Sequence, residues 1–153
     1  FIYYIKIKYI GFIKKLYYKN LFKSCGENLL VYGNANIKNP SHIVIGKNCT
    51  VNDNVYLNGW SKITIGNNVA LSASCMIIST QLNVNKFSIG VHEHDGEGIV
   101  IGNNVQVGAG AIILDGVTIG DDVVIGAGSV VTKNIEPGVI VAGVPATILR
   151  KIV

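Results

Sequence analysis

The sequence predicts an all-β fold, a parallel β-helix in which short strands stack into a solenoid, and three observations support this prediction. Aliphatic residues, mostly β-branched, recur every six positions through residues 31–78 and 99–136. Small or β-branched residues precede most of them by two positions, so each unit turns two such side chains to one side of a short strand. The chain also holds 18 glycines, which tolerate the bends that must separate such strands. A fixed short period of this kind indicates a solenoid.

The second half of the chain carries the repeat without a break. Its aliphatic position holds six residues spaced by six: Ile101, Val107, Ile113, Ile119, Ile125 and Val131. The position four residues after each of them holds Val105, Ala111, Val117, Val123, Ser129 and Ile135. Upstream the same register fits Ile45, Val51, Leu57 and Ile63, and then, after a slip of two residues, Ile65, Leu71 and Ile77. Stacked units would therefore fill the core with layers of Ile and Val.

Length and composition favour one globular domain. The 153 residues are 49% hydrophobic and only 14% charged, which excludes a disordered chain. The net charge of +4 is smaller than the charge of the six lysines in residues 1–24, where there is no acid, so the rest of the chain carries −2. A mildly acidic body is not expected to bind nucleic acid.

Residues 1–24 form a basic, aromatic segment before the repeat. A helix is predicted there from the spacing of five apolar residues: Ile2, Ile5, Tyr9, Phe12 and Leu16. Lysines every few residues argue against a secretory signal and against a membrane-spanning helix. Lysine and aromatic side chains suit peripheral contact with an anionic membrane surface. Packing against the rest of the oligomer or against a partner enzyme fits this segment equally well.

The three cysteines, Cys25, Cys49 and Cys75, have neither metal-site nor disulfide-framework spacing. We therefore expect a reducing compartment, the cytoplasm. Cys49 and Cys75 occupy the small inward position of the repeat, so buried packing is expected of both.

The stretch IGAGSVVTKNIEPGVIVAGVPA, residues 125–146, together with the hexads, resembles the acyltransferases of the hexapeptide-repeat family. This family includes galactoside, maltose, serine and bacterial polysaccharide O-acetyltransferases, and the resemblance covers residues 31–151. It implies a left-handed β-helix with three hexads per coil, a homotrimer, and acetyl-CoA bound between neighbouring subunits. The hand comes from the resemblance alone, because strand crossovers are normally right-handed.

The repeat is interrupted between Ile78 and Ile99. Ile101 follows Ile65 by 36 residues, so the ladder of strands is expected to resume in phase. We therefore predict an excursion loop at 79–98 within a β-helix domain of residues 25–151. Loops of this length in compact folds are usually functional, and in a trimer this one would reach over a neighbour.

The loop contains VHEHDGEG, residues 91–98. Acetyl transfer to a hydroxyl needs a base that works near neutral pH, and histidine suits this role. Glu93, Asp95 or Glu97 could orient the imidazole, and backbone N–H groups could stabilise the oxyanion of a direct transfer. We prefer His94, because several polysaccharide-type members of the family have a histidine five residues before the ladder resumes; His92 is second. A merely solvated polar loop is the alternative.

One departure from the family bears on this choice. The galactoside and maltose enzymes have their base directly after the last hexad before the loop, at the position of Gln81 or Leu82 here, and neither residue can act as a base. Either the histidine has moved along the loop or the chain is a weak or inactive transferase.

The resemblance also implies residues that bind acetyl-CoA. Ala109 and Ala127 would contact the pantetheine arm, Thr132 and Lys133 its distal end, and Arg150 the nucleotide phosphates, which suit a guanidinium group. Repeat packing would equally explain the two alanines, and solvated surface charges would explain Lys133 and Arg150. Three residues depart from the family pattern: Thr147 in place of a basic residue that Lys151 could replace, Gln106 in place of Trp, and Asp115 in place of Pro. The change at Asp115 is expected to affect only a turn.

The sequence thus predicts a cytoplasmic, trimeric, acetyl-CoA-dependent O-acetyltransferase, with its location extending to the inner face of the membrane. Its acceptor would be a sugar of a bacterial surface polysaccharide or of a precursor, and no metal site is expected. Two alternatives stay open. One is a zinc enzyme of the carbonic anhydrase type on the same fold, with His42, His92 and His94 as ligands. The other is a catalytically inactive trimeric assembly module.

Overall fold

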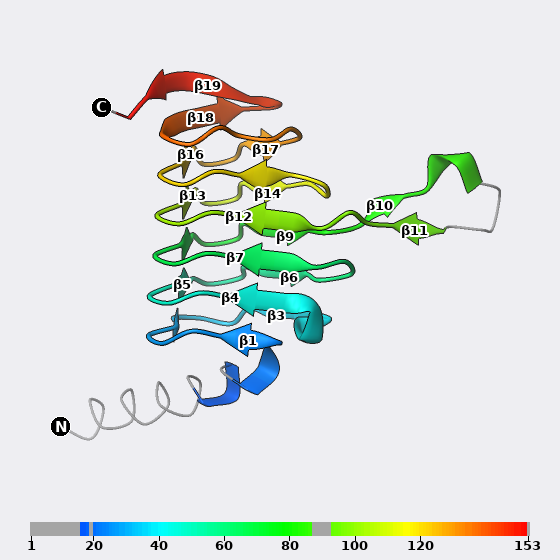
Figure 1. Cartoon of the computed structure of the whole chain (residues 1–153), viewed down its shortest axis with the longest axis vertical. Helices are drawn as coiled ribbons and strands as arrows, with labels where there is room; N and C mark the ends of the chain where they lie inside the picture. The colour runs from blue at the N-terminus through cyan, green and yellow to red at the C-terminus, as the bar shows by residue number, and fades with distance from the viewer. Residues whose placement is uncertain (1–15, 19, 87–92, 153) are drawn as a thin grey trace.

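The computed structural model describes residues 16–18, 20–86 and 93–152. It is a three-sided prism of stacked parallel strands, with a hairpin projecting from one side (Figure 1). The predicted all-β, left-handed parallel β-helix is confirmed. Of the helix predicted near the N-terminus, residues 16–18 and 20–21 are helical, and residues 1–15 lie outside the described part of the chain.

Each side of the prism is one sheet. Sheet A stacks β1 (Ser24–Cys25), β4 (Ile43–Ile45), β7 (Ile63–Ile65), β12 (Ile99–Ile101) and β15 (Thr118–Ile119). Sheet B stacks β2 (Leu30–Val31), β5 (Thr50–Val51), β8 (Ala70–Leu71), β13 (Gln106–Val107), β16 (Val124–Ile125), β18 (Val139–Gly143) and the antiparallel β19 (Ala146–Lys151). Sheet C stacks β3 (Asn36–Lys38), β6 (Tyr56–Asn58), β9 (Met76–Ile78), β14 (Ile112–Ile113) and β17 (Val130–Val131). The chain passes from sheet A to B to C in each coil, so it turns three corners: A–B, B–C and C–A.

The register of sheet A confirms that the ladder resumes after the interruption. Ile65 pairs with Ile45 on one side and with Ile101 on the other, 20 and 36 residues away. Ile101 pairs in turn with Ile119, 18 residues on. Coils before the interruption therefore take 20 residues and the coil after it takes 18, which accounts for the two-residue slip in the repeat.

The predicted inward positions form the core. All six aliphatic residues of the unbroken run are at most 1% exposed. Alternate residues of a strand point to opposite faces, so the period of six places one large side chain of every strand inside the prism. Burying each of these side chains stabilises the fold by about 1.5–3 kcal/mol.

The A–B corner is held by a ladder of side-chain amides. Residues with φ between 55° and 58° recur there in successive coils: Asn28, Asn48, Asn68, Asn104 and Asp122. Each Asn side chain donates to the side-chain oxygen of the next rung, at distances of 2.9–3.1 Å. Asn suits this corner because it tolerates the left-handed conformation and also supplies a donor and an acceptor.

Cys49 and Cys75 lie in the core, as predicted, at 1% and 0% exposure. Burial raises the pKa of the Cys75 thiol to about 12 and also raises the pKa of Cys49. Burial therefore favours the protonated thiol at both positions.

In a Cys25→Ser variant at pH 8, we expect an aromatic disulfide reagent to label neither Cys49 nor Cys75 until guanidinium unfolds the chain. The stabilisation from keeping Cys75 protonated is fully present below the ordinary thiol pKa of 9.0 and is lost as the pH rises towards about 12. Labelling kinetics measure this directly. Labelling of the native protein at the rate of an exposed thiol would contradict the assignment of both to the core.

The described part of the chain also contains two short 3-10 helices, η1 (Pro40–His42) and η2 (Val84–Lys86). Within the described residues, no helix has the length and hydropathy to cross a membrane.

Candidate functional site

A β-hairpin leaves the prism at the C–A corner, between β9 and β12 (Figure 1). Its strands are β10 (Gln81–Leu82) and β11 (His94–Asp95), which pair antiparallel. Leu82 pairs directly with His94, and Gln81 pairs with Asp95. Residues opposite one another in an antiparallel pair share a face, with Cβ atoms about 4.5–5.5 Å apart. His94 therefore presents its imidazole beside the Leu82 side chain.

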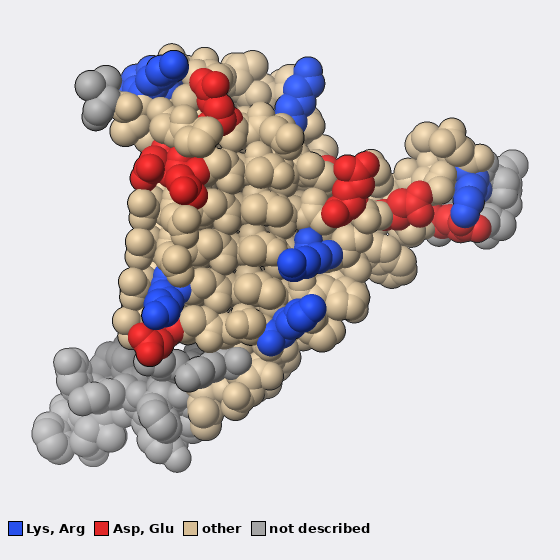
Figure 2. Space-filling view, viewed as in Figure 1, with Lys and Arg blue, Asp and Glu red and all other residues tan. Residues whose placement is uncertain are grey.

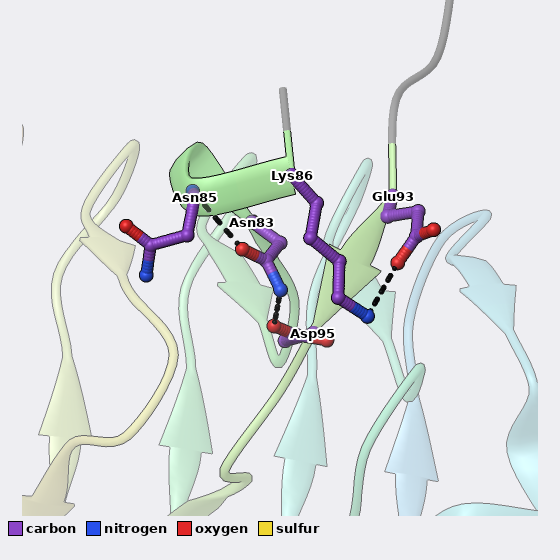
Figure 3. Close-up of polar contacts among 5 residues, drawn as sticks. All are labelled: Asn83, Asn85, Lys86, Glu93 and Asp95. Carbon is purple, nitrogen blue, oxygen red and sulfur yellow. Dashed lines mark hydrogen bonds and ion pairs between the residues drawn. The ribbon is translucent and has the colours of Figure 1, made fainter. Parts of the chain in front are cut away.

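Polar contacts hold the outer part of the hairpin (Figure 3). The Asn83 amide donates to Asp95 Oδ2 at 2.5 Å, and Asn83 Oδ1 accepts the N–H of Asn85 at 3.1 Å. Lys86 Nζ lies 2.8 Å from Glu93 Oε2, and the hydrogen bond to Glu93 raises the pKa of the exposed Lys86. The two strands are thus joined by side chains as well as by the backbone.

The carboxylates near His94 have other partners. Acidic side chains gather along the hairpin and at its foot (Figure 2). Glu93 and Asp95 flank His94 in sequence, so they point to the opposite face of the strand, where they bind Lys86 and Asn83. Among the described residues, no carboxylate accepts a hydrogen bond from the His94 ring, and so the expected orienting pair is not formed within one chain.

The His94 ring lines a surface pocket of about 520 Å³. The other residues of the pocket come from three stacked coils: Lys38, Asn39, Asn58, Trp60 and Thr80. The Trp60 and His94 ring centroids are 6.2 Å apart and their planes are inclined by 57°. Thr80 Oγ1 donates to the Asp95 carbonyl at 3.2 Å, which ties β11 to the pocket wall.

Sequence reasoning missed these pocket residues, although a signal for them exists. Trp60 is the single tryptophan of the chain, and a coil of 20 residues stacks Trp60 under Thr80 at the corner from which the loop leaves. Combining that coil length with the position of the loop would have identified Trp60 and Thr80 as neighbours of the loop.

The third histidine has a backbone role. His42 Nδ1 lies 2.9 Å from the Gly59 carbonyl oxygen and 3.0 Å from that of Trp60, and as an N–H it donates to them. His42 thereby braces the turn that carries Trp60. His92 lies outside the described residues. Within them, no three His, Cys, Asp or Glu side chains gather as metal ligands do.

The predicted pantetheine contacts lie on the B–C corner. Ala109 and Ala127 occupy equivalent positions of consecutive coils, and Gly128 N–H donates to the Ala109 carbonyl at 2.8 Å. Both alanines are exposed. Gly110 and Gly128, which follow them, have φ values of 65° and 67°, so the backbone turns here without a Cβ. The corner is a narrow ridge of small residues.

The other predicted cofactor residues lie elsewhere. Thr132 and Lys133 follow β17 at the C–A corner and are exposed. Arg150 is exposed in β19, opposite Ile140 of β18. The structure therefore brings Ala109 next to Ala127, but it places the B–C ridge and the His94 hairpin on different edges of one prism.

The three departures from the family pattern have distinct surroundings. Thr147 lies in β19, opposite Ala142. Gln106 Nε2 donates to Ser72 Oγ at 2.7 Å on the outer face of sheet B. Asp115 does more than shape its own turn, contrary to expectation, because its carboxylate accepts the N–H groups of Glu97 and Gly98 at the foot of the hairpin.

Comparison with known proteins finds relatives of the hexapeptide-repeat transferase type. A family model described as bacterial transferase hexapeptide (six repeats) matches residues 98–133. The galactoside O-acetyltransferase of Escherichia coli (strain K12) is 40% identical over an alignment of 140 residues that covers 88% of this chain and 66% of that protein. The chain thus spans slightly less than two thirds of that relative.

Solved structures of similar proteins are also acetyltransferases. A galactoside acetyltransferase in complex with coenzyme A superposes with a TM-score of 0.84 at 38% identity, covering 89% of this chain and 68% of that one. A maltose O-acetyltransferase from Clostridium difficile 630 superposes with a TM-score of 0.83 at 35% identity, covering 89% and 73%.

Proposed function

The chain belongs to the hexapeptide-repeat acyltransferase family, and on this premise we propose that it transfers an acetyl group from acetyl-CoA to a sugar hydroxyl, with His94 as general base. The pairing of His94 with Leu82 carries the proposal. Leu82 stands at or next to the position where the galactoside and maltose enzymes would have their base. Here the opposite strand of the hairpin supplies an imidazole on the same face.

The reaction is a direct transfer. His94 takes the proton of the acceptor hydroxyl as the oxygen attacks the thioester carbonyl carbon. The new C–O bond forms, the C–S bond breaks, and the imidazolium returns the proton to the departing sulfur. Glu93 binds Lys86, and Asp95 binds Asn83. A group other than these two carboxylates therefore orients the His94 ring.

The pocket beside His94 suits a sugar acceptor. A sugar ring has an apolar face that can lie on an indole and a rim of hydroxyls that needs polar partners. Trp60 offers the indole, and Asn58 and Thr80 offer an amide and a hydroxyl in the same pocket. We propose that the acceptor is a sugar of a bacterial surface polysaccharide or of its precursor, because the resemblance includes enzymes of that kind.

A homotrimer would complete the site. The B–C ridge and the His94 hairpin lie at the two edges of sheet C. Three prisms with sheet C facing a common axis would bring the B–C edge of one copy against the C–A edge of the next. The outer face of sheet C is apolar along β9, β14 and β17, as such packing requires; it carries Met76, Ile78, Ile112, Leu114 and Val130, of which Met76 and Leu114 are 39% and 38% exposed. The same face is polar at β3 and β6, where Asn36, Lys38 and Asn58 point outward. We propose that acetyl-CoA binds in the three clefts between subunits.

Acetyl-CoA is expected to raise the melting temperature of the protein, since a ligand that binds only the folded state stabilises it. An Arg150→Ala variant should bind acetyl-CoA about 10- to 100-fold more weakly, because a charge-assisted hydrogen bond to phosphate contributes about 1.5–3 kcal/mol. Thermal shift against acetyl-CoA concentration measures both effects.

Lys47→Ala removes an exposed charge at the A–B corner and serves as the matched control. Absence of any shift in the wild type would reject the transferase in favour of the assembly module. Equal affinities of the Arg150→Ala variant and the wild type would reject the phosphate contact alone.

We propose a peripheral membrane contact for residues 1–24. A cytoplasmic enzyme acting on lipid-linked acceptors would benefit from contact with the inner face of the membrane, and the lysines and aromatic residues of this segment suit that contact.

A further inference from the structure

The foot of the hairpin is held by one carboxylate from the next coil. Asp115 lies between β14 and β15, at the C–A corner just above the hairpin. Its Oδ2 accepts the N–H of Glu97 at 2.8 Å and its Oδ1 accepts the N–H of Gly98 at 3.0 Å. Both oxygens thus hold successive residues of the arm that returns from His94 to β12.

The same arm is held from the coil below by Ser61, which Ser79, at the start of the hairpin, fixes in place. Ser79 is fully buried, its Oγ lies 2.8 Å from the Asn58 carbonyl oxygen and 2.7 Å from that of Ser61, and it accepts the Ser61 N–H at 3.1 Å. Ser61 Oγ then donates to the Gly96 carbonyl at 2.8 Å. A Cβ at Gly96 would collide with the Ser61 hydroxyl and the Ser79 carbonyl oxygen. Only glycine therefore fits this contact.

These bonds connect the two rings of the pocket. Trp60 immediately precedes Ser61, and His94 lies two residues before Gly96. The Ser61–Gly96 bond therefore joins the backbones that carry both rings, and Asp115 fixes the next two residues of the same arm. Apart from the Thr80–Asp95 hydrogen bond, the exposed strand β11 has few contacts with the prism that define its position.

We propose that Asp115 is a positioning residue, which with the Ser79–Ser61–Gly96 contact holds His94 against Trp60 and the acceptor pocket. The catalytic consequence rests on the proposed function, whereas the structural one does not. Displacing a reacting group by about 1 Å can cost 100-fold in rate, so the bonds at the foot of the hairpin control the reaction without touching substrate.

Asp121 provides a matched control. Its Oδ1 accepts the N–H of Asn103 at 2.6 Å and the Asn103 side-chain amide at 3.1 Å. It therefore ties one coil to the next as Asp115 does, but at the A–B corner, away from the hairpin. Asp121→Ala should lower stability in the same way as Asp115→Ala and leave His94 in place.

The test uses the fluorescence of Trp60, the single tryptophan. A nearby imidazole changes the emission of an indole, so we expect the His94 ring, 6.2 Å from the indole between centroids, to alter the emission of Trp60 at one fixed pH. His94→Gln, which keeps His42 and His92, defines this effect of His94. Asp115→Ala should lose most of it. Asp115→Asn, which retains a single acceptor oxygen, should lose less of it.

In acetyl transfer, Asp115→Ala should lower kcat by about 10- to 100-fold with the KM for acetyl-CoA unchanged, and Asp121→Ala should match the wild type. Gly96→Ala, which displaces the same arm by steric collision, should reproduce both defects of Asp115→Ala. Hydrogen exchange at the Glu97 and Gly98 amides should accelerate in Asp115→Ala and stay at the wild-type rate in Asp121→Ala.

Wild-type fluorescence and kcat in Asp115→Ala would overturn the positioning role. Equal defects in Asp121→Ala would also overturn it, because they would reduce the effect to general stability. If the fluorescence results hold but neither the wild type nor any variant transfers acetyl groups, the proposed function fails and the positioning role stands.

Discussion

Replacing His94 with Gln is expected to lower kcat for acetyl transfer by about 10²- to 10⁴-fold, the usual contribution of a general base. Gln keeps a polar group in the pocket beside Trp60 but cannot accept the hydroxyl proton. Binding of acetyl-CoA should be unchanged, because the residues assigned to it lie on other elements. Steady-state kinetics with labelled acetyl-CoA and a panel of sugar acceptors measures the loss and also narrows the acceptor.

The pairing of His94 with Leu82 allows a sharper test. The double variant Leu82→His/His94→Leu exchanges the two side chains across the hairpin and should recover part of the activity that His94→Leu loses, because the imidazole stays on the same face. His92→Gln is the companion variant and should retain wild-type kcat. Full activity in His94→Gln, or a loss confined to His92→Gln, would reject His94 as the base.

Replacing Ile112 with Lys is expected to dissociate the proposed trimer and reduce acetyl transfer by more than 100-fold. Ile112 lies in β14 of sheet C, between Met76 and Val130, on the face that we propose packs at the three-fold axis. An unpaired charge buried in an interface costs several kcal/mol, and three copies meet at this one. Light scattering on a sizing column gives the mass, and circular dichroism checks that the β-helix persists.

The matched change is Thr118→Lys, which places the same charge on an exposed position of sheet A. It should leave both mass and activity unaltered. An active monomer of Ile112→Lys would show that one chain holds a complete site, and a stable trimer of this variant would exclude sheet C as the interface.

Much of the fold followed from local pattern. The period of six assigned the inward residues, and the 36-residue separation of Ile65 and Ile101 gave the point where the ladder resumes. The buried positions of Cys49 and Cys75 followed from the same register. These inferences succeeded because strand alternation and coil length repeat along the chain, so that every hexad shows the same pattern of inward and outward positions.

The surroundings of the candidate base did not follow in the same way. Glu93, Asp95 or Glu97 was expected to orient the His94 ring, but strand alternation turns Glu93 and Asp95 to the other face, where Lys86 and Asn83 bind them. Asp115 was expected to shape only its own turn, and it instead anchors residues from the previous coil. These hydrogen-bond partners depend on how the hairpin between β9 and β12, which does not follow the repeat, folds back onto the prism.

By itself the sequence determined the β-helix, its core and the segment that leaves it, because apolar side chains at a fixed period can be buried in one arrangement of coils. Only the tertiary structure decided that His94 faces Leu82 and that the ring centroids of Trp60 and His94 are 6.2 Å apart. It also decided that Ser61 and Asp115 bind the arm that returns from His94 to β12. These contacts join residues that no period relates, and they depend on the path of the chain out of the prism and back.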